Sequence, residues 1–590
     1  LGLRTLTVID DAITAVTANR GVTVDWDQIG LDDAAVYELF AAAETVGIFQ
    51  FESSGMRDYL RKLRPSIFED LIAMNALYRP GPLDANMIDE YIARKQGTKP
   101  VEHLHAKIER VLKSTYGVIV YQDQVMQVAG ELAGFSMAKA DTLRKAMGKK
   151  NPQIMARMKQ EFLDGAVARD VPQETAETIF EFCATFARYG FNRSHSASYA
   201  MLAYRCAWLK AHYSVEFMAA TMSSEMDNTD RIRVLMRECR RLGIPVDPPD
   251  INASHAAFTA IGDRILFGLS AVKNVGEGAV EAIVASRDAD GPFTTLYDFA
   301  RRVDARAVNK RAAEALIAAG ALESLAGHRS QLMTGLEGAF TYGARAQADR
   351  RRGQASLFEG NGGEADTEPV LPDIPAWTVE ETWGREKEAL GFFVSSHPLS
   401  AYADELELFA TATTDQAADL PDESEVQIGG VITHVKTQVD RKQQQMAFLT
   451  LEDFGGSIEV ICFSEPYRRY REILTTDSLV LLGGHLSTRE GERPKLILQS
   501  ASALADALRG AVLDVHIRLT PEQIADGVLD QLESVLSRYD NGNGIVYIYF
   551  PMGAKTVKIK SNRLRLEPDR TLVDSLRELL GDDAVYCTRG

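Results

Sequence analysis

Two cationic segments hold the side chains of this sequence that are best suited to bind phosphates. The first, Leu143–Lys150, reads LRKAMGKK, and the second, Phe191–Ala200, reads FNRSHSASYA. Their basic groups are Arg144, Lys145, Lys149, Lys150 and Arg193. Guanidinium and ammonium groups that gather in one place bind anionic oxygens strongly. A basic run is also typical of a solvated helix face, and the spacing alone leaves both explanations open.

The rest of the chain is acidic, so a polyanion would have to bind at a local basic surface. The 590 residues include 65 Lys and Arg against 83 Asp and Glu, a formal net charge of −18. Long-range attraction to a nucleic acid is therefore unfavourable, and phosphate contacts are expected only where basic groups cluster. The length exceeds one hydrophobic core and predicts roughly three to five domains.

The spacing of the cysteines indicates no disulfide framework and no metal site. The length of the apolar runs does not indicate a membrane protein. The five cysteines are far apart and form no Cys-x-x-Cys pair, which predicts a reducing, cytoplasmic compartment. No run approaches the roughly 18 apolar residues that span a bilayer, and Leu1–Asp10 lacks the pattern of a signal peptide. Because the chain starts without Met, we expect a piece or a processed form of a longer protein.

Two helical segments form a second candidate phosphate site. In Ala271–Ala285, AVKNVGEGAVEAIVA, Gly276 and Gly278 follow Lys273 and enter a helix, where free backbone N–H groups can point at a phosphate. This resembles a helix-hairpin-helix, although a plain helical turn also explains a Gly-x-Gly pair. Val308–Leu322 is the second copy. It carries Asn309, Lys310 and Arg311 instead of the glycine pair, so it binds DNA through its cations or only packs.

The period of the apolar residues changes along the chain. Leu1 to about Ser224 is mostly helical, and RPGPL at Arg79–Leu83 breaks that pattern because proline fixes φ and removes a donor. A polar stretch, Arg345–Asp373, contains the apolar island QASLF, which is typical of a peptide that docks in another protein or makes a stray turn contact. A charged helix is predicted around Glu380–Leu390.

The last third of the chain is predicted to contain strands. The expected strands are Val426–Val435, Met446–Phe454, Ser457–Ser464 and Leu479–Ser487, with a turn at Asp453–Gly456. Four or five short strands suit a small closed barrel such as an OB-fold. The remainder, to Gly590, alternates strand and helix around a predicted loop at Asp540–Gly544.

Five motifs, taken in order, resemble the fingers of the bacterial replicative polymerase family, the alpha subunits of DNA polymerase III. They are GIFQFESSGM (Gly47–Met56), ALYRPGPL (Ala76–Leu83), TYGVIVYQDQVM (Thr115–Met126), LRKAMGKK and FNRSHSASYA. The hairpins, QASLF, the segment Trp383–Pro398, the barrel and the tail follow in that family's order, so the resemblance covers essentially the whole chain.

The resemblance implies a multidomain α+β protein with mainly helical fingers and a tandem helix-hairpin-helix region, followed by a small β-barrel and a small α/β tail. The expected domains are the end of the palm (1–45), fingers (46–225), tandem hairpins (226–330), clamp-binding peptide and linker helix (331–425), OB-fold (426–505) and tail (506–590).

The family's chemistry is template-directed nucleotidyl transfer, in which two Mg²⁺ ions held by palm carboxylates activate the primer 3′-hydroxyl and the leaving group. In the family the last carboxylate lies just before the LGLRTL motif, here Leu1–Leu6. The resemblance therefore implies that the catalytic carboxylates precede this chain, which would be inactive alone. Asp10 and Asp11 are adjacent on a predicted helix and point to different faces, so they cannot replace a metal-binding pair.

The resemblance also implies the roles of the cationic segments. Arg144 and Lys145, with Lys149 and Lys150, would neutralise the triphosphate of the deoxynucleotide and its departing pyrophosphate. Arg79 is a further candidate beside the proline loop. Asn192, Arg193, Ser194 and His195 are expected to form a polar loop that holds phosphate or template, with His195 either a loop residue or a proton donor.

The expected partners are primer-template DNA, deoxynucleotides and other replication proteins. QASLF resembles the family's sliding-clamp peptide, with Gln354 at a polar rim and Leu357 and Phe358 as apolar anchors. The tail holds the position of the family's contact with the tethering subunit of the clamp loader, and a proofreading exonuclease subunit would bind the part that precedes Leu1. The barrel would stack single-stranded template on aromatic side chains, although at least half of the candidates are expected in its core. These candidates are Phe448, Phe454, Phe463 and Tyr467.

The function predicted from the sequence is part of a replicative DNA-directed DNA polymerase that supplies nucleotide and DNA binding and attachment to a sliding clamp. One alternative is a stand-alone, non-catalytic DNA- and clamp-binding module. Another is the family's error-prone second polymerase, which QASLF and the extended tail disfavour.

Overall fold

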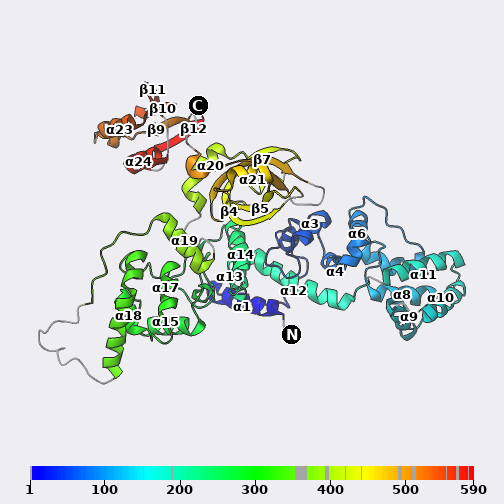
Figure 1. Cartoon of the computed structure of the whole chain (residues 1–590). Helices are drawn as coiled ribbons and strands as arrows, with labels where there is room; N and C mark the ends of the chain where they lie inside the picture. The colour runs from blue at the N-terminus through cyan, green and yellow to red at the C-terminus, as the bar shows by residue number, and fades with distance from the viewer. Residues whose placement is uncertain are drawn as a thin grey trace. The chain divides into compact units, whose positions relative to one another are not determined.

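The computed structural model in Figure 1 divides into two compact units, Leu1–Val394 and Ser395–Gly590. It describes residues 3–149, 152–187, 190–351, 368–391, 398–418, 420–439, 442–488, 494–507, 513–525, 527–552, 555–566, 570–581 and 584–589. The first unit is mostly helical, and the second contains a barrel and a mixed tail, which confirms the predicted fold class. The six predicted domain boundaries are finer than this division and stay predictions.

The first unit is built from helices joined by short loops. Its helices up to residue 241 are α1 (Arg4–Arg20), α2 (Ala34–Ala41), α3 (Ser54–Leu63), α4 (Phe68–Leu77), α5 (Pro80–Asp84), α6 (Met87–Lys95), α7 (Ala106–Leu112), α8 (Gln122–Ala133), α9 (Met137–Lys149), α10 (Pro152–Val167), α11 (Gln173–Ala187), α12 (Arg193–His212), α13 (Ser214–Ser224) and α14 (Thr229–Arg241). A small sheet of β1 (Val246–Asp247), β2 (Thr259–Ile261) and β3 (Arg264–Leu266) follows, then α15 (Glu277–Asp290), α16 (Leu296–Arg302), α17 (Lys310–Ala318), α18 (Arg329–Arg351) and α19 (Val379–Leu390).

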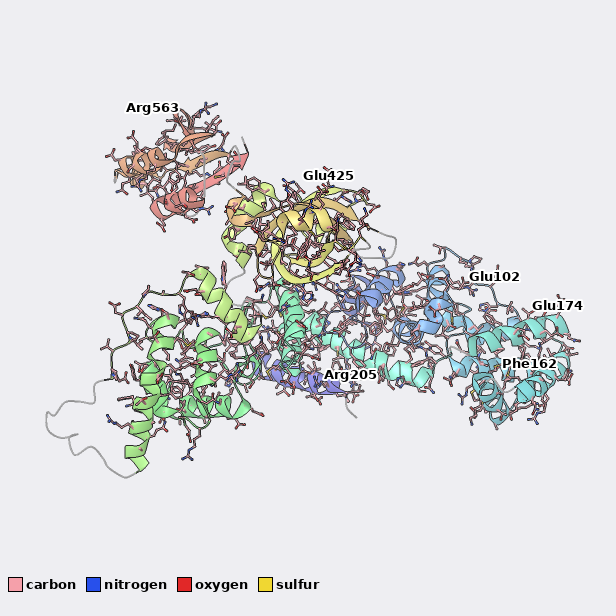
Figure 2. The ribbon with its side chains drawn as sticks, viewed as in Figure 1. Glu102, Phe162, Glu174, Arg205, Glu425 and Arg563 are labelled. Atoms are coloured by element: carbon pink, nitrogen blue, oxygen red, sulfur yellow. The ribbon has the colours of Figure 1, made fainter. Side chains whose placement is uncertain are left out.

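Two hydrophobic cores hold this unit together. The larger core takes buried residues from α1 to α6 and from α12 to α19. The smaller core lies among α7 to α11, where the ring of Phe162 is 6.1 Å from that of Phe135 and 5.4 Å from that of Phe180 (Figure 2). The chain enters the smaller core at α7, but Val118, Val120 and Tyr121, just before α8, pack in the larger core, so the start of α8 lies at the border between the cores.

The prolines of Arg79–Leu83 break the helical path, as predicted. α4 ends at Leu77, and α5 begins at Pro80. Pro80 occupies the first turn of α5, where the missing N–H costs no helical hydrogen bond. The break places Arg79 at the N-cap of α5.

The linker region is more helical than the sequence predicted. α18 continues to Arg351, so the first residues of the polar stretch Arg345–Asp373 are helical, because Ala, Gln and Arg are good helix formers. QASLF, with Gln354, Leu357 and Phe358, lies outside the described residues. α19 confirms the predicted charged helix, and Thr378 and Glu381 form a capping box at its start.

The second unit begins with α20 (Ala403–Phe409) and a closed five-stranded barrel in the order β4-β5-β6-β8-β7. The barrel strands are β4 (Glu425–Val439), β5 (Gln445–Glu452), β6 (Ser457–Cys462), β7 (Leu479–Ser487) and β8 (Lys495–Ala503), with α21 (Ser464–Tyr470) after β6. The four predicted strands and the predicted turn are confirmed, and the Asp453 carboxylate accepts from the N–H groups of Gly455 and Gly456 in that turn.

The expectation that at least half of the four barrel aromatics are core residues is wrong. Phe454 and Phe463 are 52% and 50% exposed. Phe448 alternates with the inward-facing Ala447 and Leu449, so it points away from the core, whereas Tyr467 packs against it. The barrel closes on aliphatic side chains, which fill its narrow interior without the aromatic rings.

The tail is a four-stranded sheet with helices on one face. Its elements are β9 (Leu513–Arg518), α22 (Pro521–Ala525), α23 (Val528–Leu536), β10 (Asp540–Met552), β11 (Lys555–Leu566), α24 (Arg570–Leu580) and β12 (Val585–Arg589). The sheet order is β11-β10-β9-β12, and alternate residues of β9 and β10 pack against α23 and α24. The loop predicted at Asp540–Gly544 is instead the start of β10. Asp540 and Gly544 both pair with Leu566, so the extra residues form an irregularity within the strand pair.

Among the residues that the structure describes, no helix combines the length and the apolar character needed to cross a membrane. The cytoplasmic location inferred from the cysteines stays a prediction.

Candidate nucleotide and nucleic-acid interface

The N-terminal end of α8 joins the two cationic segments in space. The backbone N–H of Gln122 donates to the carbonyl of Phe191 at 2.9 Å, and Tyr121 and Phe191 form a parallel β-bridge. The side chain of Gln122 accepts from Arg144 Nη1 at 3.0 Å and donates to the carbonyl of Gly190 at 2.9 Å. Segments far apart in the sequence therefore meet at one place, the finger junction, formed by the starts of α8 and α12 and by α9.

Asp141 orients the two cations of α9 at this junction. Its Oδ1 lies 2.7 Å from Arg144 Nη2, and its Oδ2 lies 2.7 Å from Lys145 Nζ. Hydrogen bonds from Lys145 and Arg144 lower the pKa of the Asp141 carboxyl, which keeps it ionised. Because the Lys145 side chain is 60% exposed, a phosphate can compete with Asp141 for it. Lys149 is the last residue of α9, and Lys150 lies outside the described residues.

The polar loop predicted at residues 192–195 is a helix start. Asn192 is the N-cap of α12, and its Oδ1 accepts from the backbone N–H of His195 at 2.9 Å, so Arg193, Ser194 and His195 form the first helical turn. All four residues are exposed. The ring of His195 lies 4.3 Å from that of Tyr199 in a tilted contact, with an interplanar angle of 36°. The backbone N–H of Arg193 donates to a carboxylate oxygen of Asp123 at 3.3 Å, so this side chain already lies at the positive end of the helix, where a phosphate would have to compete with it.

Arg79 extends the finger junction toward α5. Its Cζ lies 4.3 Å from the centroid of Phe191, and its Nε donates to the carbonyl of Ala76 at 2.8 Å. Burial lowers the pKa of the Arg79 guanidinium, which nevertheless keeps its charge at neutral pH. Arg193 lies nearby, with its Cζ 5.8 Å from the Tyr121 ring. The junction thus gathers four described cations: Arg79, Arg144, Lys145 and Arg193.

The first hairpin presents an open helix end. Gly276 is the N-cap of α15, no side chain caps this helix, and a Cβ at Gly276 or Gly278 would meet no atom within 4 Å. Both glycines and Lys273 are exposed. The first-turn N–H groups of α15 therefore face open space that a phosphate can enter.

The second hairpin starts with a side-chain cap instead. The Oδ1 of Asn309 accepts from the N–H of Ala312 at 2.9 Å at the start of α17. Lys310 Nζ lies 3.2 Å from a carboxylate oxygen of Glu337. Arg311 and Asn274, one from each hairpin, line the same cavity of about 440 Å³. The two hairpins therefore share one polar surface, and DNA binding by Lys310 and Arg311 stays a prediction.

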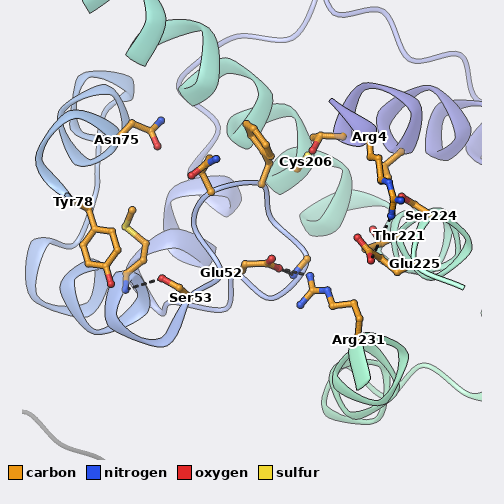
Figure 3. Close-up of a pocket in the computed structure, with 16 residues that line it drawn as sticks. Arg4, Glu52, Ser53, Asn75, Tyr78, Cys206, Thr221, Ser224, Glu225 and Arg231 are labelled. Carbon is orange, nitrogen blue, oxygen red and sulfur yellow. Dashed lines mark hydrogen bonds and ion pairs between the residues drawn. The ribbon is translucent and has the colours of Figure 1, made fainter. Parts of the chain in front are cut away.

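Sequence reasoning missed a larger cavity, of about 570 Å³, lined by the motif GIFQFESSGM (Figure 3). Glu52 points across it to Arg231 of α14, forms an ion pair there and also accepts from the N–H of Gly47 at 3.1 Å. Among the described residues, the side-chain nitrogen of Asn75, on α4, is shielded from solvent and has no hydrogen-bond acceptor. The sequence indicated this motif only through a resemblance, because Arg231, the ion-pair partner of Glu52, lies far from the motif along the chain.

The described residues do not fit the Mg²⁺ site of the family's reaction. They contain no group of three or more His, Cys, Asp or Glu side chains placed to hold a metal ion. Asp10 and Asp11 are consecutive, exposed residues of α1, so they point in different directions, as predicted. No catalytic step is therefore assigned to a metal ion on these residues.

Three family models match successive parts of the chain. Residues 5–170 match the bacterial DNA polymerase III alpha subunit finger domain, residues 243–332 a helix-hairpin-helix motif, and residues 426–504 an OB-fold nucleic acid binding domain. Curated relatives named DNA polymerase III subunit alpha match nearly the whole chain. The relative from Pasteurella multocida (strain Pm70) is 38% identical over 99% of this chain, that from Caulobacter vibrioides 38% over 98%, and that from Escherichia coli (strain K12) 34% over 99%.

The helix-hairpin-helix and OB-fold matches mark a multidomain protein with nucleic-acid-binding domains. With the matches along its length, the chain belongs to the family of bacterial DNA polymerase III alpha subunits. It corresponds to a C-terminal part of them and spans about half of their length, 52% of the Pasteurella multocida relative and 50% of the Caulobacter vibrioides relative.

Proposed function

We propose that this chain supplies nucleotide and DNA binding to a template-directed DNA polymerase that extends primers in chromosome replication. The observation that carries the proposal is the hydrogen bonding of Gln122, which joins Arg144 of one cationic segment to Phe191, the first residue of the other. In this proposal, Arg144 and Lys145 bind the triphosphate, while Arg79 and the first turn of α12 contact phosphate or template. The carboxylates that hold Mg²⁺ would be supplied by the part of the subunit that this chain does not span.

The position of Arg144 suits the negative charge that develops on the departing pyrophosphate during the reaction. Arg144 is held by Asp141 and Gln122, so its guanidinium is positioned before the nucleotide arrives. A preorganised cation stabilises the departing pyrophosphate more than the bound ground state. Arg144 is therefore expected to matter more for the incorporation step than for DNA affinity.

Steady-state incorporation by a complete polymerase, assembled from this chain and the remainder of the subunit, tests the proposal. Arg144→Ala should lower kcat/KM for a deoxynucleotide by an amount equivalent to about 2–4 kcal/mol, with a smaller loss of primer-template affinity. Arg157→Ala removes an exposed arginine of α10 outside the junction and serves as the control. Unchanged incorporation by a folded Arg144→Ala enzyme would reject the triphosphate assignment.

The same assay separates this function from the alternatives. The chain by itself is expected to show no primer extension at any Mg²⁺ concentration, and extension by the purified chain would reject the proposed position of the carboxylates. If the assembled subunit also fails to extend primers while DNA binding persists, the stand-alone binding module is the better description. Replacement of the replicative subunit in growing cells distinguishes it from the error-prone second polymerase.

We also propose that QASLF docks in a sliding clamp. The support is its sequence and its position in the family's order. Leu357→Ala with Phe358→Ala should weaken clamp binding by upward of about 2 kcal/mol for each anchor, measured by surface plasmon resonance. Ser356→Ala is the matched control, and undiminished binding by the double variant would show that the clamp binds elsewhere. Contacts of the tail with the clamp loader's tethering subunit, and of the remaining part of the subunit with a proofreading exonuclease, complete the proposed partners.

A further inference from the structure

One face of the tail sheet carries a row of aromatic and basic side chains. The residues that face each other across β11, β10, β9 and β12 are Lys560, Tyr547, His516 and Tyr586. The neighbouring residues of this face include Lys558 and Arg518, both paired in register with Tyr549. Because side chains alternate across a strand, this face is opposite to the one that packs on α23 and α24.

Three of these rings stand parallel to one another on adjacent strands. The His516 ring lies 4.9 Å from Tyr547 with an interplanar angle of 12°, and 4.7 Å from Tyr586 with an angle of 6°. His516 is held upright by Tyr549 Oη and Thr588 Oγ1, each 2.9 Å from a ring nitrogen. Burial and the nearby Lys558 lower the pKa of His516, so the central ring is uncharged at neutral pH.

Cations cover both ends of this ring ladder, defined as Tyr547, His516 and Tyr586. Lys558 Nζ lies 3.9 Å from the Tyr547 centroid, and Arg518 Cζ lies 4.9 Å from the Tyr586 centroid. Lys558 reaches Tyr547 from β11, on the side away from His516, whereas Arg518 reaches Tyr586 from β9, the strand of His516. The attraction between a cation and an exposed aromatic ring is modest, so a phosphate can compete with the ring for the cation.

The charge on this face is unbalanced in a chain that is otherwise acidic. Arg518, Lys558 and Lys560 are exposed, and among the described residues none of them forms an ion pair with a carboxylate. Asp514 is the acidic residue of β9, and its Oδ1 accepts from the backbone N–H of Ile545 at 2.9 Å. The whole chain has a formal net charge of −18, so three cations on one sheet face mark a local site for an anion.

We propose that this sheet face binds single-stranded nucleic acid. Arg518, Lys558 and Lys560 contact successive phosphates, and bases stack on the outer faces of Tyr547 and Tyr586, the first of which Lys558 vacates. A single strand fits because its bases are free to stack on aromatic rings, whereas the bases of a duplex are already stacked. An acidic polypeptide would use the cations but leave the ring faces without a matching planar group. The site goes beyond the proposed function, which assigns no nucleic-acid contact to the tail. The tail also follows the last of the three matched segments, which ends at residue 504.

Binding to the full chain, compared among three matched double variants, tests the proposal. Arg518→Ala with Lys558→Ala removes two cations, and Tyr547→Leu with Tyr586→Leu removes the two outer rings without changing charge. Arg538→Ala with Arg563→Ala removes two exposed cations of the tail outside the ladder and is the control. The probes are oligothymidylate, an abasic strand of equal length and polyglutamate, measured by fluorescence anisotropy, with thermal unfolding as the check on folding.

Both ladder variants should lower oligothymidylate affinity at least about fivefold, while the control changes it less than about twofold. Loss of the cations should make the slope of log K against log salt less steep by roughly 1.4, whereas loss of the rings should leave it unchanged. The abasic strand should respond to the cation variant and not to the ring variant.

Photo-crosslinking of an iodouracil-substituted strand to the native chain locates the site without any variant that has to fold. The crosslinked peptides also distinguish binding by the tail from binding by the barrel. Crosslinked peptides that contain Tyr547 or Tyr586 are expected. Crosslinks confined to other parts of the chain, or affinities unchanged in both folded ladder variants, would overturn the proposal. Polyglutamate binding that depends on Arg518 and Lys558, with oligothymidylate binding unaffected, would instead assign the face to an acidic protein.

Discussion

The finger junction and the first hairpin are both candidate anion sites at a helix N-terminus, but they present different groups to the anion. At the start of α12, Asn192 caps the helix, and the surrounding charge comes from the side chains of Arg79, Arg144 and Arg193. At the start of α15, no side chain caps the helix, and Gly276 leaves the backbone N–H groups uncovered. The first site therefore depends on charge, and the second depends on space for a phosphate to approach.

The largest loss of DNA affinity is expected when bulky side chains replace the two glycines of the first hairpin, because this site depends on space. Gly276→Val with Gly278→Val should weaken duplex DNA binding roughly tenfold or more at low salt, because each lost hydrogen bond to a charged acceptor costs about 1.5–3 kcal/mol. Fluorescence anisotropy on two unrelated duplexes should show equal losses, since phosphate contacts carry no sequence information.

Gly338→Val with Gly384→Val is the matched control for that experiment. These glycines lie on α18 and α19, and a Cβ at either would also meet no atom within 4 Å. The control should fold and bind DNA normally. Equal affinities of both double variants would show that the glycine pair of the first hairpin is only a packing element.

A smaller effect is expected from removing charge at the second hairpin, where Lys310 and Arg311 stand in place of the glycines. Lys310→Ala with Arg311→Ala should make the salt dependence of duplex binding less steep by roughly 1.8, or about 0.9 for each phosphate contact. Glu337→Gln should act in the opposite direction by releasing Lys310 from its ion pair. If neither change alters the slope of log K against log salt, α17 does not contact the DNA.

The smallest effect is expected from the cap of α12. Asn192→Ala should destabilise the first turn by about 1 kcal/mol, which corresponds to roughly fivefold faster hydrogen exchange of its amides. Asn192→Ser should restore most of the protection, since Ser also caps well. Exchange followed by mass spectrometry suits a chain of several domains, whose unfolding is not a single transition. Equal exchange in the Ala and Ser variants would show that tertiary contacts, not the cap, hold the turn.

Features within single elements could be predicted from the sequence. The proline break before α5, the charged helix α19 and four barrel strands follow from local rules of backbone geometry and side-chain alternation. The same rules failed where polar residues can either form a loop or begin a helix or strand. Residues 192–195 begin a helix because Asn192 finds the N–H of His195, and Asp540–Gly544 joins a strand because Leu566 pairs with it.

The amino-acid sequence by itself determined which groups are available: two cationic segments, a glycine pair with open backbone, and an apolar peptide in a polar stretch. Only the tertiary structure decided which of them meet. Gln122 links Arg144 to Phe191, Glu52 reaches Arg231 across a cavity, and His516 stacks between Tyr547 and Tyr586. The physical reason is that sequence spacing fixes neighbours within one helix or strand, whereas contacts between elements depend on how the hydrophobic cores pack.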